Sequence, residues 1–280
     1  MLTIDIGCDM LYSVRQQTVF LFQIASATTA HQRVVSQNLN ISQYLEIQSF
    51  QSGTEGNCLH RVIVDPCEMR INYRARMEMA PTVVSTVEVG ETPMAEMPPE
   101  VLTYLNPSRY CESDLLARFA YEEFGHLHRG YSRVQAICNW VFEQLDYTPG
   151  STIGTTTAAD VLLQRTGVCR DYAHLAITLC RGVGIPARYV AGYAVNLQPP
   201  DFHGFMEAFL DGQWYLFDPT RLSLVSGLVR IGVGRDAADV SFATINGDAR
   251  LEEKSVWANL AEEASEVTLE QIGDAGISTA

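Results

Sequence analysis

Gly167-Val-Cys169-Arg-Asp-Tyr-Ala-His-Leu175 is the stretch from which the fold and the chemistry of this chain are predicted. Gly167 allows a tight turn, and the apolar residues behind it recur at the spacing of a partly buried helix: Tyr172, Ala173, Ala176, Ile177, Leu179 and Cys180. Cys169 then lies on the first turn, where unpaired backbone N–H groups and the helix dipole stabilise a thiolate. The same N–H groups can donate to an oxyanion formed beside the sulfur. We therefore predict a nucleophilic Cys169, against the alternative of a buried structural cysteine.

A β-hairpin is predicted downstream, where Asp211-Gly212 separates the run His203–Leu210 from Gln213–Thr220. Asp-Gly between two such runs is typical of a type I′ turn. With a two-residue loop, the last residue of the first strand faces the first residue of the second. Counting outward from there makes His203 and Asp218 diagonal neighbours on one face, about 7 Å apart at the backbone. Their side chains are then within reach of each other.

These three residues together indicate a catalytic triad. An acid that orients a histidine, which pairs with a thiolate at a helix N-terminus, is the arrangement of nucleophile, base and orienting group. Taken alone, the histidine is explained as well by core packing and the Asp-Pro pair by a plain turn. Their combination with the cysteine favours catalytic roles for Cys169, His203 and Asp218.

The same segments carry a family resemblance. The region from Thr152 to Tyr193, including TTTAADVLLQRTGVCRDYAHLAITLCRGVGIPARYVAGY, and the later HGFMEAFLDGQWYLFDPT resemble the core of the transglutaminase-like superfamily, in its bacterial branch of cysteine-protease-like proteins. The family's nucleophile, histidine and aspartate motifs match at Cys169, His203 and Asp218. The resemblance implies a papain-like α+β fold, in which a helix with the cysteine packs on an antiparallel sheet with the other two residues. Phe205 departs from the tryptophan that is common in the family at this position.

The chain divides into three predicted parts. Residues 1–105 show alternating or β-branched runs separated by turn residues, which predicts an N-terminal β-sandwich domain with strands at Gln17–Ile24, Gln43–Phe50, Leu59–Val64, Glu68–Met79 and Thr82–Val89. A proline-rich linker, Glu91–Glu100, marks the boundary. Residues 106–250 form the catalytic core, and Gly234–Arg250 resembles a segment that often follows this core. Residues 251–280 are acidic, and we expect a solvated helix or a fraying tail there.

After the linker the apolar spacing changes to that of helices. We expect Ser113 to cap a helix that Gly125 ends, and an apolar stripe from Val134 to Leu145 to form the next one. Thr157 is expected to cap a short helix before Cys169. The strand Ile185–Tyr193 then precedes the hairpin, so the order of elements predicts an α+β domain.

Residues near the predicted triad receive mostly structural interpretations. Asp171 is expected to complement the helix dipole, and Arg170 to be a surface charge. Glu207 shares the predicted face of the triad, which suggests a structural role or a substrate contact. His174 points to another side of the helix and is rejected as the base. Two aromatic residues that can line a cleft are interpreted as core packing: Tyr147 and Trp214.

The amino-acid composition limits the partners and the cellular compartment that we expect. The net charge of −14 over 280 residues argues against nucleic acid and anionic membranes as partners. Seven cysteines without a regular framework are typical of reduced intracellular proteins. The apolar run Val19–Ala27 is too short to span a bilayer, and its acidic leading segment is unlike a signal peptide, so we expect a cytoplasmic protein. The spacing of Cys58, His60 and Cys67 matches no zinc pattern, and we predict neither a metal nor a cofactor.

The predicted reaction is acyl transfer from a peptide or protein substrate. The Cys169 thiolate attacks an amide carbonyl, His203 protonates the leaving amine, and a thioester remains. We favour hydrolysis, as in a cysteine protease or amidase, because the bacterial branch is protease-like and no calcium-loop pattern appears. Two alternatives stay open. One is a protein-glutamine transglutaminase or deamidase, and the other is a non-catalytic binding or scaffold protein that acts through the β-sandwich.

Overall fold

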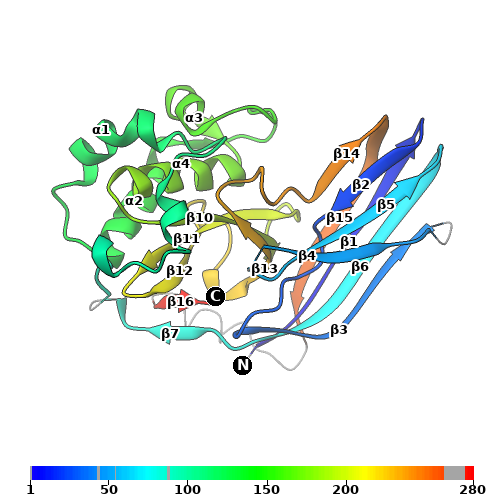
Figure 1. Cartoon of the computed structure of the whole chain (residues 1–280), viewed down its shortest axis with the longest axis horizontal. Helices are drawn as coiled ribbons and strands as arrows, with labels where there is room; N and C mark the ends of the chain where they lie inside the picture. Colours follow the sequence, from blue (N-terminus) through cyan, green and yellow to red (C-terminus); the bar gives the residue numbers. More distant parts are fainter. Residues whose placement is uncertain (1, 43–44, 54, 87–88, 262–274) are drawn as a thin grey trace.

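The computed structural model describes residues 2–42, 45–53, 55–86, 89–261 and 275–280. Helices gather at one end of the molecule and long strands at the other, with a smaller sheet between them (Figure 1). The start of the predicted strand Gln43–Phe50, two residues near the end of the predicted strand Thr82–Val89 and residues 262–274 of the predicted acidic segment lie outside the described residues. No helix in the described ranges is long and apolar enough to cross a membrane.

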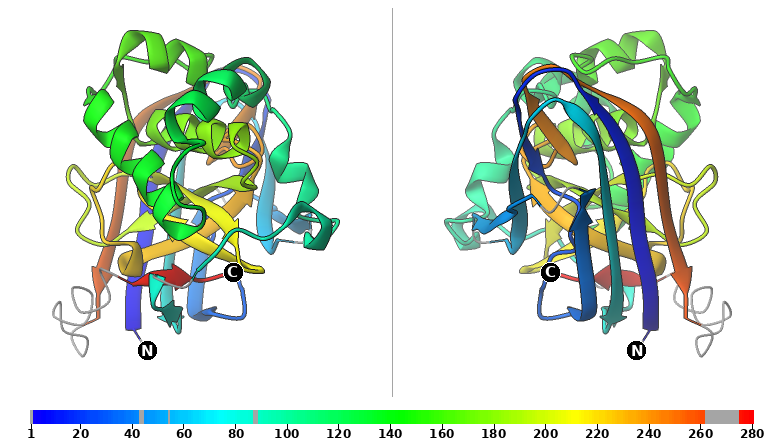
Figure 2. Two further views of the ribbon diagram at one scale, coloured as in Figure 1. Left: turned by 90° about the vertical axis from the view of Figure 1, so that its left-hand side faces the viewer. Right: turned by 90° about the vertical axis from the view of Figure 1, so that its right-hand side faces the viewer.

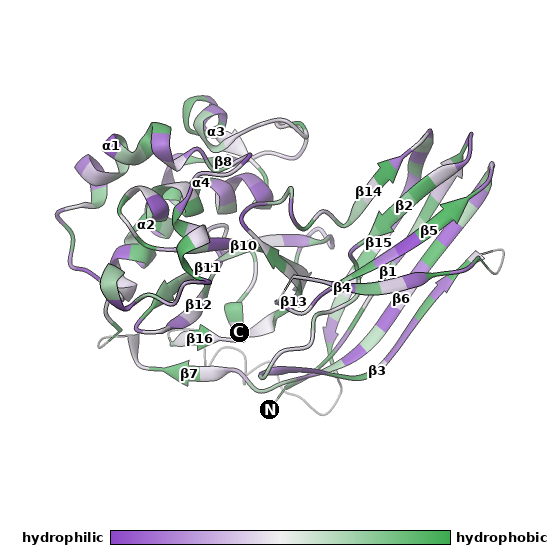
Figure 3. Cartoon of the chain, in the orientation of Figure 1, coloured by the Kyte–Doolittle hydropathy of each residue, from purple (hydrophilic) through white to green (hydrophobic). Residues whose placement is uncertain are grey.

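The long strands form a sandwich of two four-stranded antiparallel sheets, as predicted. One sheet has the order β15 (Ala249–Leu260), β1 (Leu2–Val14), β6 (Cys67–Met79) and β3 (Gln32–Ile41). The other has the order β14 (Ala243–Asn246), β2 (Thr18–Phe22), β5 (Asn57–Val64) and β4 (Gln48–Ser52). Buried and exposed residues alternate along β6, and hydrophobic and hydrophilic residues alternate along the same strand in Figure 3. Strands β1 and β3 have no counterpart among the individually predicted strands.

The sandwich is completed by residues that follow the core, and here one prediction is wrong. Residues 251–260 are neither a solvated helix nor a tail, since they belong to β15, which pairs with β1 along its length (Figure 2). Val256 and Ala258 alternate inward, whereas Glu252, Glu253 and Lys254 lie on the exposed part of an edge strand. Charged side chains are common on such edges because they prevent pairing with other chains. The run of charged residues therefore made a half-buried edge strand resemble a solvated segment in the sequence.

The core is an antiparallel sheet with helices on one face, which confirms the predicted α+β class. The sheet has the order β12 (Gln213–Phe217), β11 (His203–Leu210), β10 (Ala187–Ala194) and β13 (Leu228–Gly234). Helix α4 (Cys169–Gly182) packs on this sheet through a shared apolar cluster. The surrounding helices are α1 (Ser113–Phe124), α2 (Tyr131–Gln144) and α3 (Ala158–Gln164).

Local sequence signals explain how these elements begin and turn. Asp211 and Gly212 have φ values of 46° and 76°, as a type I′ turn requires, and Leu210 pairs with Gln213. Thr157 caps α3 in a capping box, as predicted. Ser113 differs from its prediction, because it is the first residue of α1 and Glu112 occupies the cap position.

Sandwich and core share their packing. The apolar cluster of the sandwich continues into Tyr193, Val229 and Ile231 of the core sheet. The side chain of Asn57 bonds both peptide groups of Val233, at 2.8 and 2.9 Å. The Tyr193 hydroxyl donates to the carbonyl of Ile24 at 2.8 Å. These contacts join the sandwich to β10 and to β13, which is an edge strand of the core sheet.

Short elements complete the chain. The predicted strand Thr82–Val89 is observed as β7 (Thr82–Val84), which pairs with β16 (Gly276–Ser278). Two-residue strands β8 (Asp146–Tyr147) and β9 (Thr166–Gly167) pair in parallel. The 3₁₀ helices are η3 (Met94–Glu96), η4 (Leu102–Leu105) and η5 (Val225–Gly227). The β8–β9 pair leads directly into α4 and therefore positions the start of that helix.

Candidate active site

Cys169 is the first residue of α4 and is half-buried. The β8–β9 pair holds the turn before it, and Thr148 donates its N–H to the carbonyl of Gly167 at 2.9 Å. A Cβ on Gly167 would lie 2.8 Å from the Cβ of Asp171, so the tight approach of the turn to the helix requires glycine. The thiol therefore lies where the sequence predicted it, at the positive end of the helix dipole.

Asp171 anchors this helix end. It is fully buried and accepts hydrogen bonds from the Val168 N–H at 2.9 Å and the Thr152 hydroxyl at 2.6 Å. Its other oxygen pairs with Arg170 at 2.9 Å. Asp171 therefore lies in the first turn of α4, where it complements the helix dipole, and it also binds the N-cap residue Val168. Arg170 was predicted to be a surface charge. In the structure it is paired with Asp171 and lines the cavity beside Cys169.

His203 and Asp218 are joined as the hairpin register predicts. Nε2 of His203 lies 2.8 Å from Oδ2 of Asp218, and both side chains are buried. The carboxylate is held in place by the N–H and hydroxyl of Thr220, at 3.0 and 2.7 Å, and by the N–H of Ser223 at 3.3 Å. Nδ1 of His203 has no hydrogen-bond partner among the described residues. His203 and Cys169 line one cavity, so Nδ1 is the nitrogen left for the thiol.

The surroundings of His203 favour its charged form. Burial alone would lower its pKa, but the charge and hydrogen bond of Asp218, together with the neighbouring Cys169 thiol, raise the pKa to about 10. A protonated imidazole beside a thiol at a helix N-terminus stabilises the thiolate. The site therefore combines a thiol at a helix N-terminus with a histidine that a carboxylate orients.

Two tyrosines next to Cys169 were not predicted as site residues. Tyr147, opposite Gly167 in the β8–β9 pair, is 38% exposed, and burial followed by the neighbouring Cys169 raises the pKa of its phenol. This exposure contradicts its interpretation as core packing. Tyr189 of β10 is buried and lines the cavity, and burial followed by the charge of Cys169 raises its pKa. The residues around Tyr189 in the sequence do not indicate that it lies beside the thiol.

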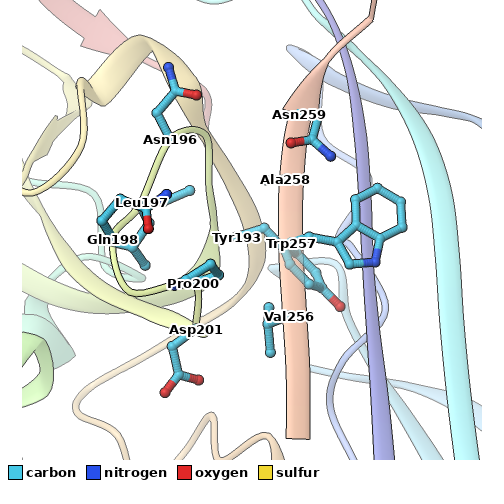
Figure 4. A pocket seen from close by; sticks show the side chains of 11 residues that line it. Tyr193, Asn196, Leu197, Gln198, Pro200, Asp201, Val256, Trp257, Ala258 and Asn259 are labelled. Carbon is cyan, nitrogen blue, oxygen red and sulfur yellow. The ribbon is translucent and has the colours of Figure 1, made fainter.

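The cavity beside the thiol has a volume of about 380 Å³. Its walls come from the start of α4, from β10, β11 and β13, and from the returning segment that contains Phe242 and Lys254. Lys254 belongs to β15, so the sandwich contributes to the site. A separate cavity of about 90 Å³ lies between the loop at 196–201 and β15 (Figure 4). Asp201 borders both this cavity and the one beside Cys169.

Other candidate residues lie away from the thiol. Glu207 is fully buried and pairs with Arg188 at 2.6 Å and with Arg230, so its role is structural. Trp214 stacks over the guanidinium of Arg188 at 4.0 Å. His174 is buried and accepts a hydrogen bond from the N–H of Ala237 at 3.1 Å. Its burial, which is the largest cause, lowers its pKa to about 3.

Within the part of the chain that the structure describes, no three histidine, cysteine or acidic side chains are grouped to hold a metal ion. The sulfur of Cys58 lies 3.8 Å from Nε2 of His60, which is a contact of two residues on one strand.

Two family models match the chain. The model of the transglutaminase-like superfamily matches residues 118–219, and the model of the bacterial transglutaminase N-terminal domain matches residues 2–100. A crystal structure of a protein from Cytophaga hutchinsonii, provisionally designated a cysteine protease, is similar over the whole chain. It is 35% identical with a TM-score of 0.92, over 99% of this chain and 97% of that chain.

Curated relatives are uncharacterized proteins of mycobacteria. One from Mycobacterium leprae is 33% identical over 146 residues, which is 49% of this chain and 52% of that protein. One from Mycobacterium tuberculosis is 36% identical over 115 residues, which is 36% of this chain and 37% of that protein. The matched regions thus span about half of these relatives or less.

Proposed function

This chain belongs to the transglutaminase-like superfamily, and on that premise we propose that it is a thiol-dependent acyl-transfer enzyme that cleaves an amide bond. One observation carries the proposal. The bond from Nε2 of His203 to Asp218 leaves Nδ1 without a partner among the described residues, and His203 lines the same cavity as Cys169 at the start of α4. A nucleophile, a histidine that can carry its proton and an acid that orients the histidine are then adjacent in that sequence, as acyl transfer requires.

In the proposed reaction the thiolate of Cys169 attacks the carbonyl carbon of the amide. The carbonyl oxygen becomes an oxyanion, which the N–H of Cys169 stabilises. The tetrahedral intermediate collapses, the C–N bond breaks, and the proton on Nδ1 of His203 passes to the leaving amine. The acyl group remains on sulfur as a thioester. Water then gives up a proton to His203, attacks the thioester and releases the acid.

Tyr147 supplies the second oxyanion donor in this proposal. Its phenol is next to Cys169 and partly exposed, so an O–H can reach a carbonyl oxygen that enters from the solvent side. A phenol is protonated at neutral pH, as a donor requires, and burial raises the pKa of Tyr147 further. Preorganised donors of this kind are usually the largest electrostatic contribution to acyl transfer.

Hydrolysis is the favoured end of the cycle. The structurally similar protein from Cytophaga hutchinsonii is designated a cysteine protease, which supports a proposal of hydrolysis here. Transfer to an amine is the second candidate, since the model that matches residues 2–100 is named after bacterial transglutaminases. The two differ in whether water or an amine attacks the thioester, and the same three residues serve both.

Alkylation by iodoacetamide across pH tests the assembled pair. We expect Cys169 to react fastest of the seven cysteines. Cys58 and Cys67, which are also half-buried, are internal controls for access, whereas the other four cysteines are buried. The His203→Ala variant should slow the alkylation of Cys169 and leave that of Cys58 unchanged. If Cys169 reacts no faster than Cys58 and Cys67, the proposed thiolate–imidazolium pair is wrong.

A second experiment separates hydrolysis from transfer. An acylated Cys169 is generated with an activated ester in buffer and, in parallel, in buffer with a primary amine. The mass of the released acyl product then shows whether water or the amine attacked. We expect the free acid in both samples, and a product that is mainly the amide would support the second candidate.

A further inference from the structure

The cavity beside Cys169 has an apolar wall opposite the reacting groups. Phe202 and Phe242 stack with ring centroids 5.1 Å apart, and both line the cavity. Ile231 and Val240 are buried next to them, and Ala191 of β10 completes this side. These residues come from three separate parts of the core and from the segment that returns to the sandwich. The wall is fixed by packing on both sides, because Phe202 and Phe242 also join the apolar cluster of the sandwich.

The charged groups around this cavity are already paired. Arg170 lies 2.9 Å from Asp171, Lys254 lies 2.7 Å from Asp201, and His203 is bonded to Asp218. The hydroxyl of Tyr110, another lining residue, donates to the carbonyl of Gly154 at 2.7 Å. A charged substrate side chain would lose its hydration here without gaining a free partner of opposite charge, which is costly. A polar amide side chain would face the same apolar wall.

We propose that this cavity is a specificity pocket for an uncharged apolar side chain, aromatic or branched aliphatic, on the substrate residue that adjoins the attacked amide. The inference rests on the proposed function, because it assigns the substrate of the same thiol. A volume of about 380 Å³ is within the range of roughly 300–1,000 Å³ for pockets that bind small ligands. Burial of such a side chain removes apolar surface from water on both partners, whereas glycine gains nothing from the wall.

Acylation by p-nitrophenyl esters of N-acetyl amino acids tests the pocket. The activated leaving group makes acylation of Cys169 measurable even where an amide reacts slowly, and intact mass locates the adduct. We expect kcat/KM for the phenylalanine and leucine esters to exceed that for the glycine ester by roughly tenfold or more. The glutamine and glutamate esters should fall below phenylalanine and leucine by a similar factor.

A variant that fills the cavity makes the test specific. Ala191→Leu places a larger side chain on the cavity wall and should abolish the preference for phenylalanine over glycine, while the glycine ester still reacts. Ala95→Leu, on the exposed 3₁₀ helix η3, is the matched control and should keep the full preference. Should Ala191→Leu fail to fold, Phe242→Ala, on the partly exposed side of the wall, enlarges the cavity instead. It should shift the preference from phenylalanine towards the larger tryptophan ester.

The outcomes separate the pocket from the proposed function. If esters acylate Cys169 in the wild type but not in Cys169→Ala, and glycine or glutamine reacts as well as phenylalanine and leucine, the pocket is wrong and the nucleophile stands. If no ester acylates Cys169, the proposed function fails, and the pocket fails with it. A preference for phenylalanine that is unchanged in the cavity variant that folds also overturns the assignment, because the selectivity then arises elsewhere.

Discussion

The ammonium of Lys254 lies 2.7 Å from Oδ2 of Asp201, and this pair joins strand β15 of the sandwich to the loop that leads into His203. Both residues border the cavity of Cys169. Lys254 also lies over the ring of Phe242, 5.7 Å from its centroid. The chain's single lysine therefore connects the sandwich with the loop and the aromatic wall of the candidate site. The sandwich therefore contributes to the walls of the candidate site through β15.

We expect the ion pair itself to add little stability. The side chains of Lys254 and Asp201 are 28% and 45% exposed, and exposed pairs contribute at most about 1 kcal/mol. A double-mutant cycle with Lys254→Met and Asp201→Asn, measured by urea unfolding, should give a coupling energy below about 1 kcal/mol. A coupling energy above about 2 kcal/mol would mean that the pair is far less hydrated than its exposure indicates.

Gly167→Ala should disturb the start of α4. The added Cβ would lie 2.8 Å from the Cβ of Asp171, so the turn or the helix end has to shift. We expect a loss of about 1–3 kcal/mol in the free energy of unfolding, as for other overpacked sites, and slower alkylation of Cys169. Urea unfolding and iodoacetamide kinetics measure the two effects.

Gly90→Ala is the matched control for this substitution. A Cβ at Gly90 meets no atom within 4 Å, and its φ is not in the left-handed region. We expect neither its stability nor the reactivity of Cys169 to fall. An unchanged Gly167→Ala protein would show that the turn has more room than the structure indicates.

Much of the candidate site could be predicted because local rules determine it. The Asp211-Gly212 turn sets the register of the hairpin, and the register brings His203 to Asp218. Helical spacing behind Gly167 likewise places Cys169 on the first turn of α4. Each of these inferences needs only residues that are near one another in the chain, together with the geometry of one turn or one helix.

Such local rules do not predict which strands pair when they are far apart in the sequence. The pairing of β15 with β1 joins residues about 250 positions apart, and the charges of an edge strand resemble those of a solvated segment. Glu207 was assigned correctly to its strand, but its partners Arg188 and Arg230 lie on other strands. Tyr189 and Lys254 reach the cavity from β10 and β15, and no spacing in the sequence connects them with Cys169.

The raised pKa of His203 predicts a pH dependence of stability. Its pKa of about 10 in the folded protein is above the ~6.5 of an unfolded histidine. The folded state therefore holds the proton more tightly. This contribution is complete below about pH 6.5 and is lost as the pH rises through the folded pKa. We expect the free energy of unfolding to decrease between about pH 6.5 and 9 in Cys169→Ala, in which Asp218 still raises the pKa of His203 and no thiol titrates beside the imidazole, and to decrease less in the double variant Cys169→Ala/His203→Gln.

Urea unfolding at several pH values measures this difference. His126→Gln, which removes an exposed histidine, should keep the pH dependence of Cys169→Ala when it is introduced into that variant. Because Cys169, the thiol coupled to His203, is absent from all of these proteins, the comparison isolates His203. Equal slopes for Cys169→Ala and Cys169→Ala/His203→Gln would contradict the charged imidazole.

Tyr147→Phe separates the oxyanion donor from the nucleophile. Amide and ester cleavage pass through a tetrahedral oxyanion, whereas alkylation by iodoacetamide displaces iodide at a saturated carbon and forms none. Loss of one oxyanion donor typically reduces kcat by about 10²–10³-fold. We therefore expect Tyr147→Phe to slow the cleavage of an acyl substrate by roughly 10²-fold and to leave the alkylation of Cys169 nearly unchanged. If both rates fall together, Tyr147 acts on the thiol itself, and the second oxyanion donor has to be sought in another residue beside Cys169.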